Sequence, residues 1–515
     1  MSKFKERLGA LVKGEGLTSG TITAIVIAIV IALNVVFYAL GVVLYTPDTA
    51  DDLEISGTTD RLFSEERVGD KTVTVTFCMA RDDIISGTGN TAMKGRYVLS
   101  TAEQLAERYD FVSMRFLNII TKQSVSADDS SDIQYVDIDR YRQTDALGKE
   151  IPLLKSSVIF ECGDEVKIFT DTYTSEGYSD FFTLDSSGNI MAYNGEEVMA
   201  SMIGWVLEDE HKTAYFTTYH GEVADISFRT MLICSGYNVE MINLKEREVP
   251  DDADVLLISN PKSDFERAAV GSNIRTEIER MRTYLERGGS LYVALDPYAG
   301  RFPVLESFLS EYGIKISSAE REGKHYRNIV RDTDNAITAD FFTLVADLAD
   351  SPLAGGVSEE LRKYKQSGIL VSSCAALELS GDAQPLLLSS PSSSTFAGGE
   401  VTSDRGSFCL SAISYAKDAD GAEAGRVMVI PSIYLTAGDA LVSGGYANRD
   451  FLYAVLDTVF NSPNVPYGCN TVFYTSETLE SLTMQTARIF TAIIMMIPVA
   501  VGAVGVFVIV RRKNR

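Results

Sequence analysis

Histidine and tryptophan are scarce in this chain. Its 515 residues include three histidines and one tryptophan. Histidine is the side chain that most often serves acid–base catalysis near neutral pH, and it is the commonest metal ligand. The sequence therefore favours a protein that binds over one that catalyses, and it predicts neither a metal site nor a cofactor.

Motifs for nucleotide binding and nucleophilic catalysis are also missing. The sequence has no Walker A loop and no G-x-S-x-G nucleophile elbow, and Gly87-x-Gly89 lacks the third glycine of a Rossmann fingerprint. The cysteines match no zinc spacing, and buried thiols and disulfides are equally compatible with their positions. They are Cys78, Cys162, Cys234, Cys374, Cys409 and Cys469.

Acidic residues outnumber basic ones. The chain has 71 Asp and Glu residues against 46 Lys and Arg residues, which gives a net charge of −25. A surface of this sign repels nucleic acid and anionic lipid head groups. We therefore expect no nucleic-acid partner.

Two charge-free apolar runs, Ile22–Leu44 and Ile489–Val510, lie near the ends of the chain. At about 1.5 Å per residue, each is long enough to cross a hydrocarbon core of roughly 30 Å. A cleaved signal peptide is the alternative for the first run, but the run exceeds the length of a signal's apolar region. We expect transmembrane helices over residues 21–45 and 489–510.

Basic residues flank the two runs on their outer sides, at Lys3, Lys5, Arg7, Lys13, Arg511, Arg512, Lys513 and Arg515. By the positive-inside rule, the tails 1–20 and 511–515 should be cytoplasmic and residues 46–488 extracytoplasmic. The predicted localisation is the cell membrane, with the lipid bilayer around both spans.

Small residues recur every four positions in the first run, at Gly20, Ala24, Ala28 and Ala32. Such a stripe allows a second membrane helix to approach closely. Ordinary alanine content of a membrane helix explains the pattern equally well.

Residues 46–210 predict a small α/β unit. Lys71–Met79 and Val112–Phe116 alternate as strands do, and Ser100-x-x-Glu103 predicts a helix start. A hairpin is expected around Gly163, and Glu196 and Glu197 should precede a further helix, where carboxylates suit the helix dipole and have a structural role. This order of elements makes a thioredoxin-like topology the working hypothesis.

Residues 211–475 predict a Rossmann-like α/β unit. Strands are expected over 213–218, 239–244, 255–259, 290–295 and 426–430, with the helix Ile274–Leu285 among them. Alternating strands and helices indicate a parallel sheet. Residues 330–420 are expected to be an insertion, with Ser389–Ser394 as an exposed loop, and residues 476–488 a linker to the second span.

Polar residues follow three of these strands directly. They are His220 and Glu222, Asn260 and Lys262, and Asp296. Ligands of open α/β sheets bind at the carboxyl ends of the strands, so these residues predict a ligand-binding cleft. The alternative is that they only solvate turns.

Several strings resemble a known family when their order is considered. They are Thr217–Glu222, Gly236–Glu240, Asp252–Ile258, Tyr284–Gly289, Leu295–Pro297 and Asn448–Asp450. Together they resemble the gliding-motility-type auxiliary subunits of ABC transporters, also described as an ABC-type uncharacterized transport system domain. Tyr219 stands where that family favours a glycine.

The resemblance implies a chain that works beside an ABC permease and, through it, a cytoplasmic ATPase. The family has no established catalytic residues. We therefore expect a non-enzymatic auxiliary subunit whose extracytoplasmic region binds substrate or couples the complex to the envelope. The alternatives are a membrane-anchored sensor or cell-wall-binding protein, and a hydrolase that uses His220, Glu222 and Asp296.

Overall fold

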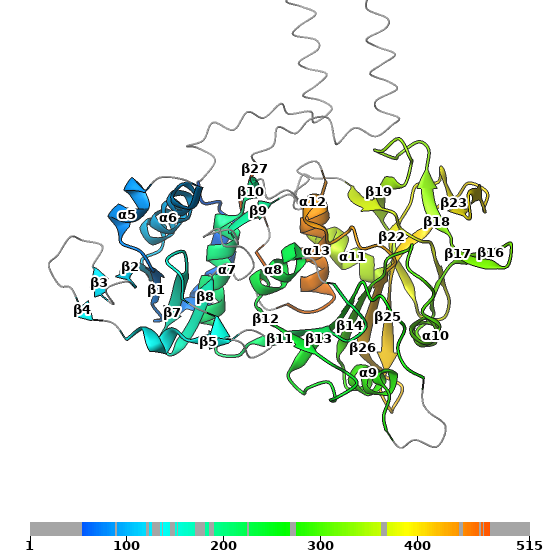
Figure 1. Cartoon of the computed structure of the whole chain (residues 1–515), viewed down its shortest axis with the longest axis horizontal. Coiled ribbons are helices and arrows are strands. Elements are labelled where there is room, and N and C mark those ends of the chain that lie inside the picture. The colour runs from blue at the N-terminus through cyan, green and yellow to red at the C-terminus, as the bar shows by residue number, and fades with distance from the viewer. Residues whose placement is uncertain are drawn as a thin grey trace, which may run out of the picture. The chain divides into compact units, whose positions relative to one another are not determined.

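The computed structural model describes residues 54–473, with gaps at 88–89, 120–122, 126–133, 136, 145–149, 152, 170–180, 185–189, 224–225, 268–273, 362–367, 442–445, 463–464 and 467. All described residues belong to one of the chain's two compact units (Figure 1). The other unit, Met1–Thr46 with Ser476–Leu479, lies outside the described residues.

The predicted membrane-anchored architecture with two spans requires correction. Within the part of the chain that the structure describes, no helix combines the length and the apolar character that crossing a membrane requires. Helix α6 (Asn90–Arg108) is interrupted by charged residues such as Lys94 and Glu103, and the apolar α7 (Gly195–Leu207) reaches only about 20 Å. The structure shows a mixed α/β protein with several sheets.

Several predictions about the chain ends fall outside the described residues. They are the spans 21–45 and 489–510, the basic tails, the linker 476–488, and the stripe of Gly20, Ala24, Ala28 and Ala32.

The first large sheet has six strands in the order β4-β3-β2-β1-β7-β8. Strand β1 pairs in parallel with β2, and α6 lies between these two strands in the sequence. On its other side, β1 pairs antiparallel with β7, which forms a hairpin with β8. The sheet thus combines a parallel βαβ unit with an antiparallel hairpin, and the thioredoxin-like topology of residues 46–210 stays a prediction. The strands are β1 (Val73–Phe77), β2 (Val112–Asn118), β3 (Gln123–Val125), β4 (Gln134–Tyr135), β7 (Val158–Cys162) and β8 (Glu165–Phe169).

Helix α6 begins earlier than its sequence suggests. The motif Ser100-x-x-Glu103 predicts a start at Ser100, but the helix runs from Asn90. Ser100 lies in its interior, where its hydroxyl accepts a hydrogen bond from Gln104. The prediction of a capping box there is wrong, because the same spacing also places two polar residues on one face of a continuous helix.

The second large sheet has eleven strands, and its main path is β12-β11-β13-β14-β26-β25-β22-β19-β20. The first five strands are parallel, which confirms the four parallel strands expected from residues 212–300. The remaining strands pair antiparallel, so residues 343–417 extend the same sheet. The path strands are β11 (Lys212–Thr217), β12 (Tyr237–Ile242), β13 (Ala253–Ser259), β14 (Ser290–Ala294), β19 (Thr343–Leu348), β20 (Ile369–Ser372), β22 (Gln384–Leu388), β25 (Cys409–Lys417) and β26 (Glu423–Ile430).

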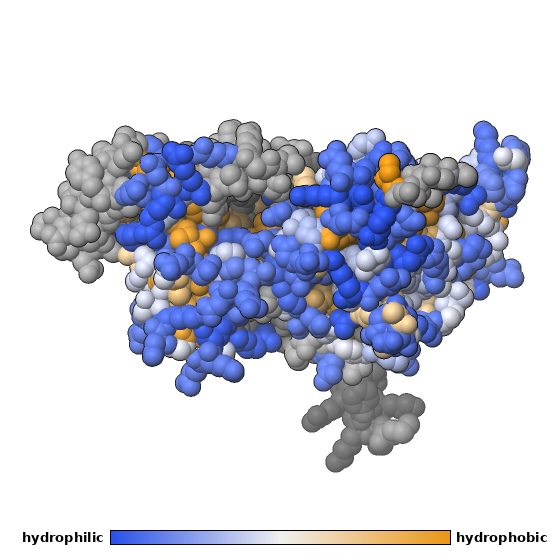
Figure 2. Space-filling view, turned by 90° about the horizontal axis from the view of Figure 1, so that it is seen from below, coloured by the Kyte–Doolittle hydropathy of each residue, from blue (hydrophilic) through white to orange (hydrophobic). Residues whose placement is uncertain are grey.

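Helices cover both faces of this second sheet (Figure 1). Alternate residues of β11 show the division, because Ala214 and Phe216 face one core and Tyr215 faces the other. One face packs against α8 (Ile226–Cys234), α11 (Pro352–Leu361) and α13 (Asn448–Thr458), and the other against α9 (Glu277–Glu286) and α10 (Pro303–Glu311). Away from these cores, the face in Figure 2 is mostly hydrophilic.

Smaller elements complete the described chain. The short helices are α3 (Thr59–Leu62), α4 (Glu65–Val68), α5 (Arg81–Ser86) and α12 (Gly438–Leu441). The other strands are β5 (Gln143–Thr144), β6 (Glu150–Ile151), β9 (Phe182–Leu184), β10 (Ile190–Tyr193), β15 (Ile314–Ile316), β16 (Ser318–Arg321), β17 (Lys324–Arg327), β18 (Ile329–Asp332), β21 (Leu377–Leu379), β23 (Ser393–Ala397), β24 (Glu400–Val401) and β27 (Val472–Phe473).

Helix α9 is shorter than predicted at its start. Thr276 is the N-cap and forms a capping box with Glu279, so the helix cannot include Ile274. Ile278, Met281 and Leu285 are buried as the apolar stripe predicts, but Ile274 is 77% exposed. The apolar spacing predicts one turn too many, because the Thr276 cap starts the helix after Ile274.

The serine-rich segment Ser389–Ser394 is not the exposed loop that its composition suggests. Ser390 and Ser393 are buried, and with Ser392 their hydroxyls donate hydrogen bonds to the fully buried carboxylate of Asp332 at 2.5–3.1 Å. Burial raises the pKa of Asp332, but the hydrogen bonds outweigh this effect and hold the pKa below its usual value. The serines are buried because they satisfy this carboxylate.

Helix α7 is buried along its whole length, and Glu196 and Glu197 lie in its first turn. Glu196 accepts hydrogen bonds from the backbone and hydroxyl of Ser56, from the Thr59 hydroxyl and from the backbone of Asn470. One carboxylate therefore joins the two ends of the described region. The expected structural role of this acidic pair is consistent with these contacts.

Glu197 connects α7 to the second sheet. It forms an ion pair with Arg449 and accepts a hydrogen bond from the hydroxyl of Tyr453, and both partners lie on α13. Arg449 also donates to the side chains of Asn194 and Thr471, at 2.8 and 3.0 Å. Three acceptors for one buried guanidinium make this a closed network.

We predict that Arg449→Met lowers the free energy of unfolding by about 3–5 kcal/mol, because it leaves Glu197 buried without its counter-charge. Urea unfolding of the full-length chain measures the change, and Glu197→Gln in the same chain should recover part of the loss. The control is Arg282→Met, whose exposed pair with Glu311 should contribute less than about 1 kcal/mol. Equal effects of the two arginine variants would contradict the prediction.

Candidate functional site

The loops that follow β11, β13 and β14 meet at the carboxyl edge of the parallel strands. Two non-glycine residues in these loops adopt a left-handed backbone, Tyr219 with φ 96° and Asn260 with φ 52°. A bulky residue in this region is strained, so the surrounding contacts must hold it there. Glycine would adopt such a φ without strain, and glycine is what the resembling family favours at position 219.

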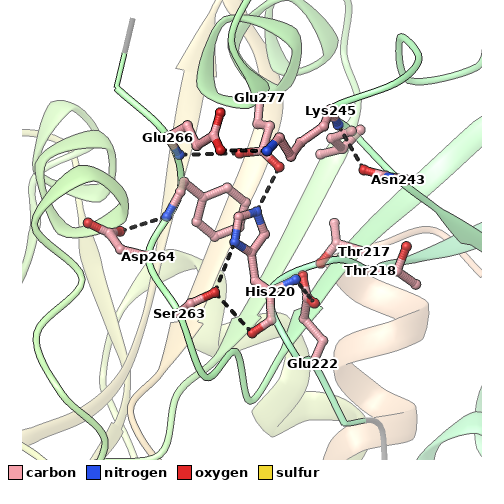
Figure 3. A network of polar contacts seen from close by, with 12 residues as sticks. Thr217, Thr218, His220, Glu222, Asn243, Lys245, Ser263, Asp264, Glu266 and Glu277 are labelled. Carbon is pink, nitrogen blue, oxygen red and sulfur yellow. Dashed lines mark hydrogen bonds and ion pairs between the residues drawn. The ribbon is translucent and has the colours of Figure 1, made fainter.

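His220 is the residue around which this edge is arranged (Figure 3). Its Nε2 lies 2.7 Å from Oε1 of Glu277, the first residue of α9, and the two side chains are only 2% and 3% exposed. The ring of Phe265 lies against the imidazole, with 4.2 Å between centroids. The pair fixes the loop after β11 to the start of α9.

Backbone groups reinforce this connection. The His220 carbonyl accepts from the N–H groups of Lys262 and Ser263, at 2.7 and 3.1 Å, and the His220 N–H donates to Glu222 at 2.7 Å. The other carboxylate oxygen of Glu277 accepts from the backbone of Glu266. Loops from two neighbouring strands are thereby held in one conformation.

The pKa of His220 reflects competing effects. Burial alone would lower it, but the hydrogen bond to Glu277 and the charges of Glu277 and Glu222 together raise it above the usual value. Lys245 acts in the opposite direction. The protonated imidazole is therefore favoured by folding.

The other three predicted residues form a separate, more exposed group. Lys262 Nζ lies 2.6 Å from Oδ1 of Asn260 and 3.8 Å from Oδ2 of Asp296. Asp296 also accepts from the backbone of Tyr298. The structure thus brings all five predicted residues to one edge, with His220 enclosed and Lys262 at the surface.

An alignment that resembles a catalytic relay passes through His220. The hydroxyl of Ser263, which the sequence did not single out, lies 3.4 Å from Nδ1, opposite the Glu277 contact. A hydrolase also needs backbone donors for the oxyanion, but the N–H groups of Lys262 and Ser263 are already bonded to the His220 carbonyl. The imidazole is enclosed as well, so the arrangement favours a structural role.

Exposed apolar side chains lie at this edge beside the polar ones, and the sequence analysis did not predict them. Tyr219 and Val223 after β11 are 60% and 59% exposed, Tyr298 after β14 is 63%, and Tyr434 after β26 is 44%. The ring of Tyr219 lies 4.0 Å from Lys245 Nζ. Large apolar residues just beyond strand ends were the available signal in the sequence.

Comparisons with known proteins do not assign a family. No protein-family model matches the chain, and no curated protein does. Among solved structures, the N-terminal domain of mmIFT52 is similar over 49% of this chain and 99% of its own, with 16% identity and a TM-score of 0.36.

Two further structures are similar at the same low level. A ThuA-like protein from Bacteroides uniformis covers 48% of this chain and 89% of its own, with 12% identity and a TM-score of 0.29. PurLQS from Thermotoga maritima covers 48% and 100%, with 11% identity and a TM-score of 0.29. Likenesses this weak carry no argument, so the resemblance to ABC auxiliary subunits stays a prediction.

We predict that His220→Gln destabilises the fold more at pH 5.5 than at pH 9. Because folding raises the pKa of His220, its contribution is fully present below its unfolded pKa of about 6.5 and is lost as the pH rises through the folded pKa. At pH 5.5 we expect a loss of about 2 kcal/mol, typical of a buried hydrogen bond between charged groups.

Urea unfolding at both pH values measures this difference. His325→Gln is the control, since His325 is exposed on β17 and its replacement should change the free energy of unfolding little. A His220 variant whose deficit does not depend on pH would contradict the coupling.

Proposed function

We propose that the chain is a non-enzymatic auxiliary subunit of an ABC transport complex, located at the cell membrane with the described region on the extracytoplasmic side. It docks on the permease, and through it on the cytoplasmic ATPase, by the carboxyl edge of its parallel strands. Docking serves substrate binding or coupling of the complex to the envelope. The family resemblance supplies the partners in this proposal.

The observation that carries the proposal is the set of exposed tyrosines over a rigid edge. Tyr219, Tyr298 and Tyr434 follow three strands of one sheet, and neighbouring strands are about 4.8 Å apart. Tyrosine is enriched at protein interfaces and among residues that dominate their binding energy. The His220 network fixes the loop that carries Tyr219, so this tyrosine loses little conformational entropy on binding.

We predict that the double variant Tyr219→Ser and Tyr298→Ser weakens recovery of the permease at least tenfold, as expected when central aromatic contacts are lost. Coexpression with a tagged permease, followed by purification and quantitative blotting, measures the recovery. Ile85→Ser is the matched control, because Ile85 is an exposed apolar residue on α5, away from the edge. Undiminished recovery of the tyrosine variant would refute docking by this edge.

A second candidate function is acyl hydrolysis with Ser263 as nucleophile, favoured by its alignment with His220 and Glu277. A fluorophosphonate probe labels serines of this kind when they are activated. We expect no labelling of the full-length chain. Labelling that disappears in Ser263→Ala would establish the hydrolase and overturn the non-enzymatic proposal.

A further inference from the structure

A cavity of about 550 Å³ lies beside the loop that follows β14. The loop Pro297–Arg301 forms one wall, and the hairpin strand β17 and the turn after β23 form others. Ligand pockets typically have volumes of roughly 300–1,000 Å³, so this one has room for a small organic molecule. None of the residues predicted from the sequence as ligand-binding lines it.

Four phenylalanine and tyrosine side chains line the cavity. Phe342 and Phe396 pack edge to face, with 5.7 Å between their ring centroids, and Tyr298, Tyr326 and Ile329 line the same space. Tyr298 and Tyr326 are 63% and 37% exposed, which places them toward solvent. Flat apolar groups pack favourably against such rings.

One of the charged side chains that line the cavity is a buried cation. Arg327 is 7% exposed, and its Nη2 donates to the Gly300 carbonyl and to Glu306, both at 3.1 Å. Nη1 is buried and has no hydrogen-bond partner among the described residues. The guanidinium carbon lies 5.6 Å from the ring centroid of Phe302, which is no substitute for an acceptor.

The charges around Arg327 do not balance. Arg301 and Arg327 share the carboxylate of Glu306, at 3.5 and 3.1 Å, and the more distant Asp296 is paired with Lys262. One positive charge therefore remains in a cavity of a chain whose net charge is −25. Buried charges in a folded protein are usually paired, and an anion in the cavity would offset the charge of Arg327.

We propose that this cavity binds a small organic monocarboxylate with a flat, apolar body. Its carboxylate faces Arg327 and its body packs against the Phe342–Phe396 pair. A phosphate group fits less well, because the first N–H groups of α10, at Val304 and Leu305, already bond to Asp264. One surplus charge also matches a monoanion. The inference is independent of the transport proposal.

Isothermal titration calorimetry of the purified full-length chain tests this, with its own buffer as blank. The probes are 2-naphthoate and its neutral analogue 2-naphthamide. We expect the carboxylate to bind at least tenfold more tightly, since a charged hydrogen bond distinguishes the two probes. Equal affinities, or no saturable binding of 2-naphthoate, would overturn the proposal.

Variants locate the binding within the cavity. Arg327→Met keeps the apolar stem and should reduce the preference for 2-naphthoate to about twofold or less. Ala299→Phe places a ring in the cavity and should weaken both probes at least tenfold while Arg327 remains. Ile85→Ser removes an exposed apolar side chain outside the lining and should bind as the wild type does.

Circular dichroism confirms that each variant is folded. Should Arg327→Met fail to fold, Ala299→Phe and the comparison of the two probes still decide the question. A folded Ala299→Phe chain that binds both probes like the wild type would show that the cavity is not the site.

Discussion

Two adjacent carboxylates at the start of a fully buried helix connect segments of the described fold that are distant in sequence. Glu196 and Glu197 cannot remain charged in the interior unless donors surround them, since isolated buried charges are very costly. The donors come from segments distant in sequence, near Ser56, Arg449 and Asn470. The hydrogen bonds and the ion pair of this one helical turn therefore hold both ends of the described region and helix α13 together.

The carboxyl edge of the second sheet obeys the same rule at a smaller scale. His220 and Glu277 form an enclosed polar pair, and backbone donors around them are consumed in holding loops. These contacts favour a structural role for His220, and the exposed side chains at this edge include the tyrosines and Lys262. Rigidity beneath an exposed aromatic surface suits recognition more than chemistry.

Sequence patterns predicted what depends on neighbours along the chain. The parallel strands β11 to β14 and the buried stripe of Ile278, Met281 and Leu285 follow from local periodicity and the βαβ order. Sequence patterns could not predict features that depend on contacts between residues distant in the chain. The local sequence predicts a loop at Ser390, because its partner Asp332 lies 58 positions away. The strands of the antiparallel half of the sheet likewise pair without a sequence pattern that predicts their pairing.

The candidate site divides along the same line. Parallel strands end at a common edge, so the sequence predicts that His220, Lys262 and Asp296 lie together. Burial decides which of these side chains a ligand can reach, and burial depends on how the whole chain packs. The sequence does not predict the aromatic cavity, because its walls come from segments about a hundred residues apart and none of these segments contains a motif. Arg327 shows why a polar residue needs its surroundings to be interpreted. In the sequence it is one of many arginines in segments with strand periodicity. Only the structure shows that its guanidinium is enclosed and shares Glu306 with Arg301, which is why we propose an anionic ligand there.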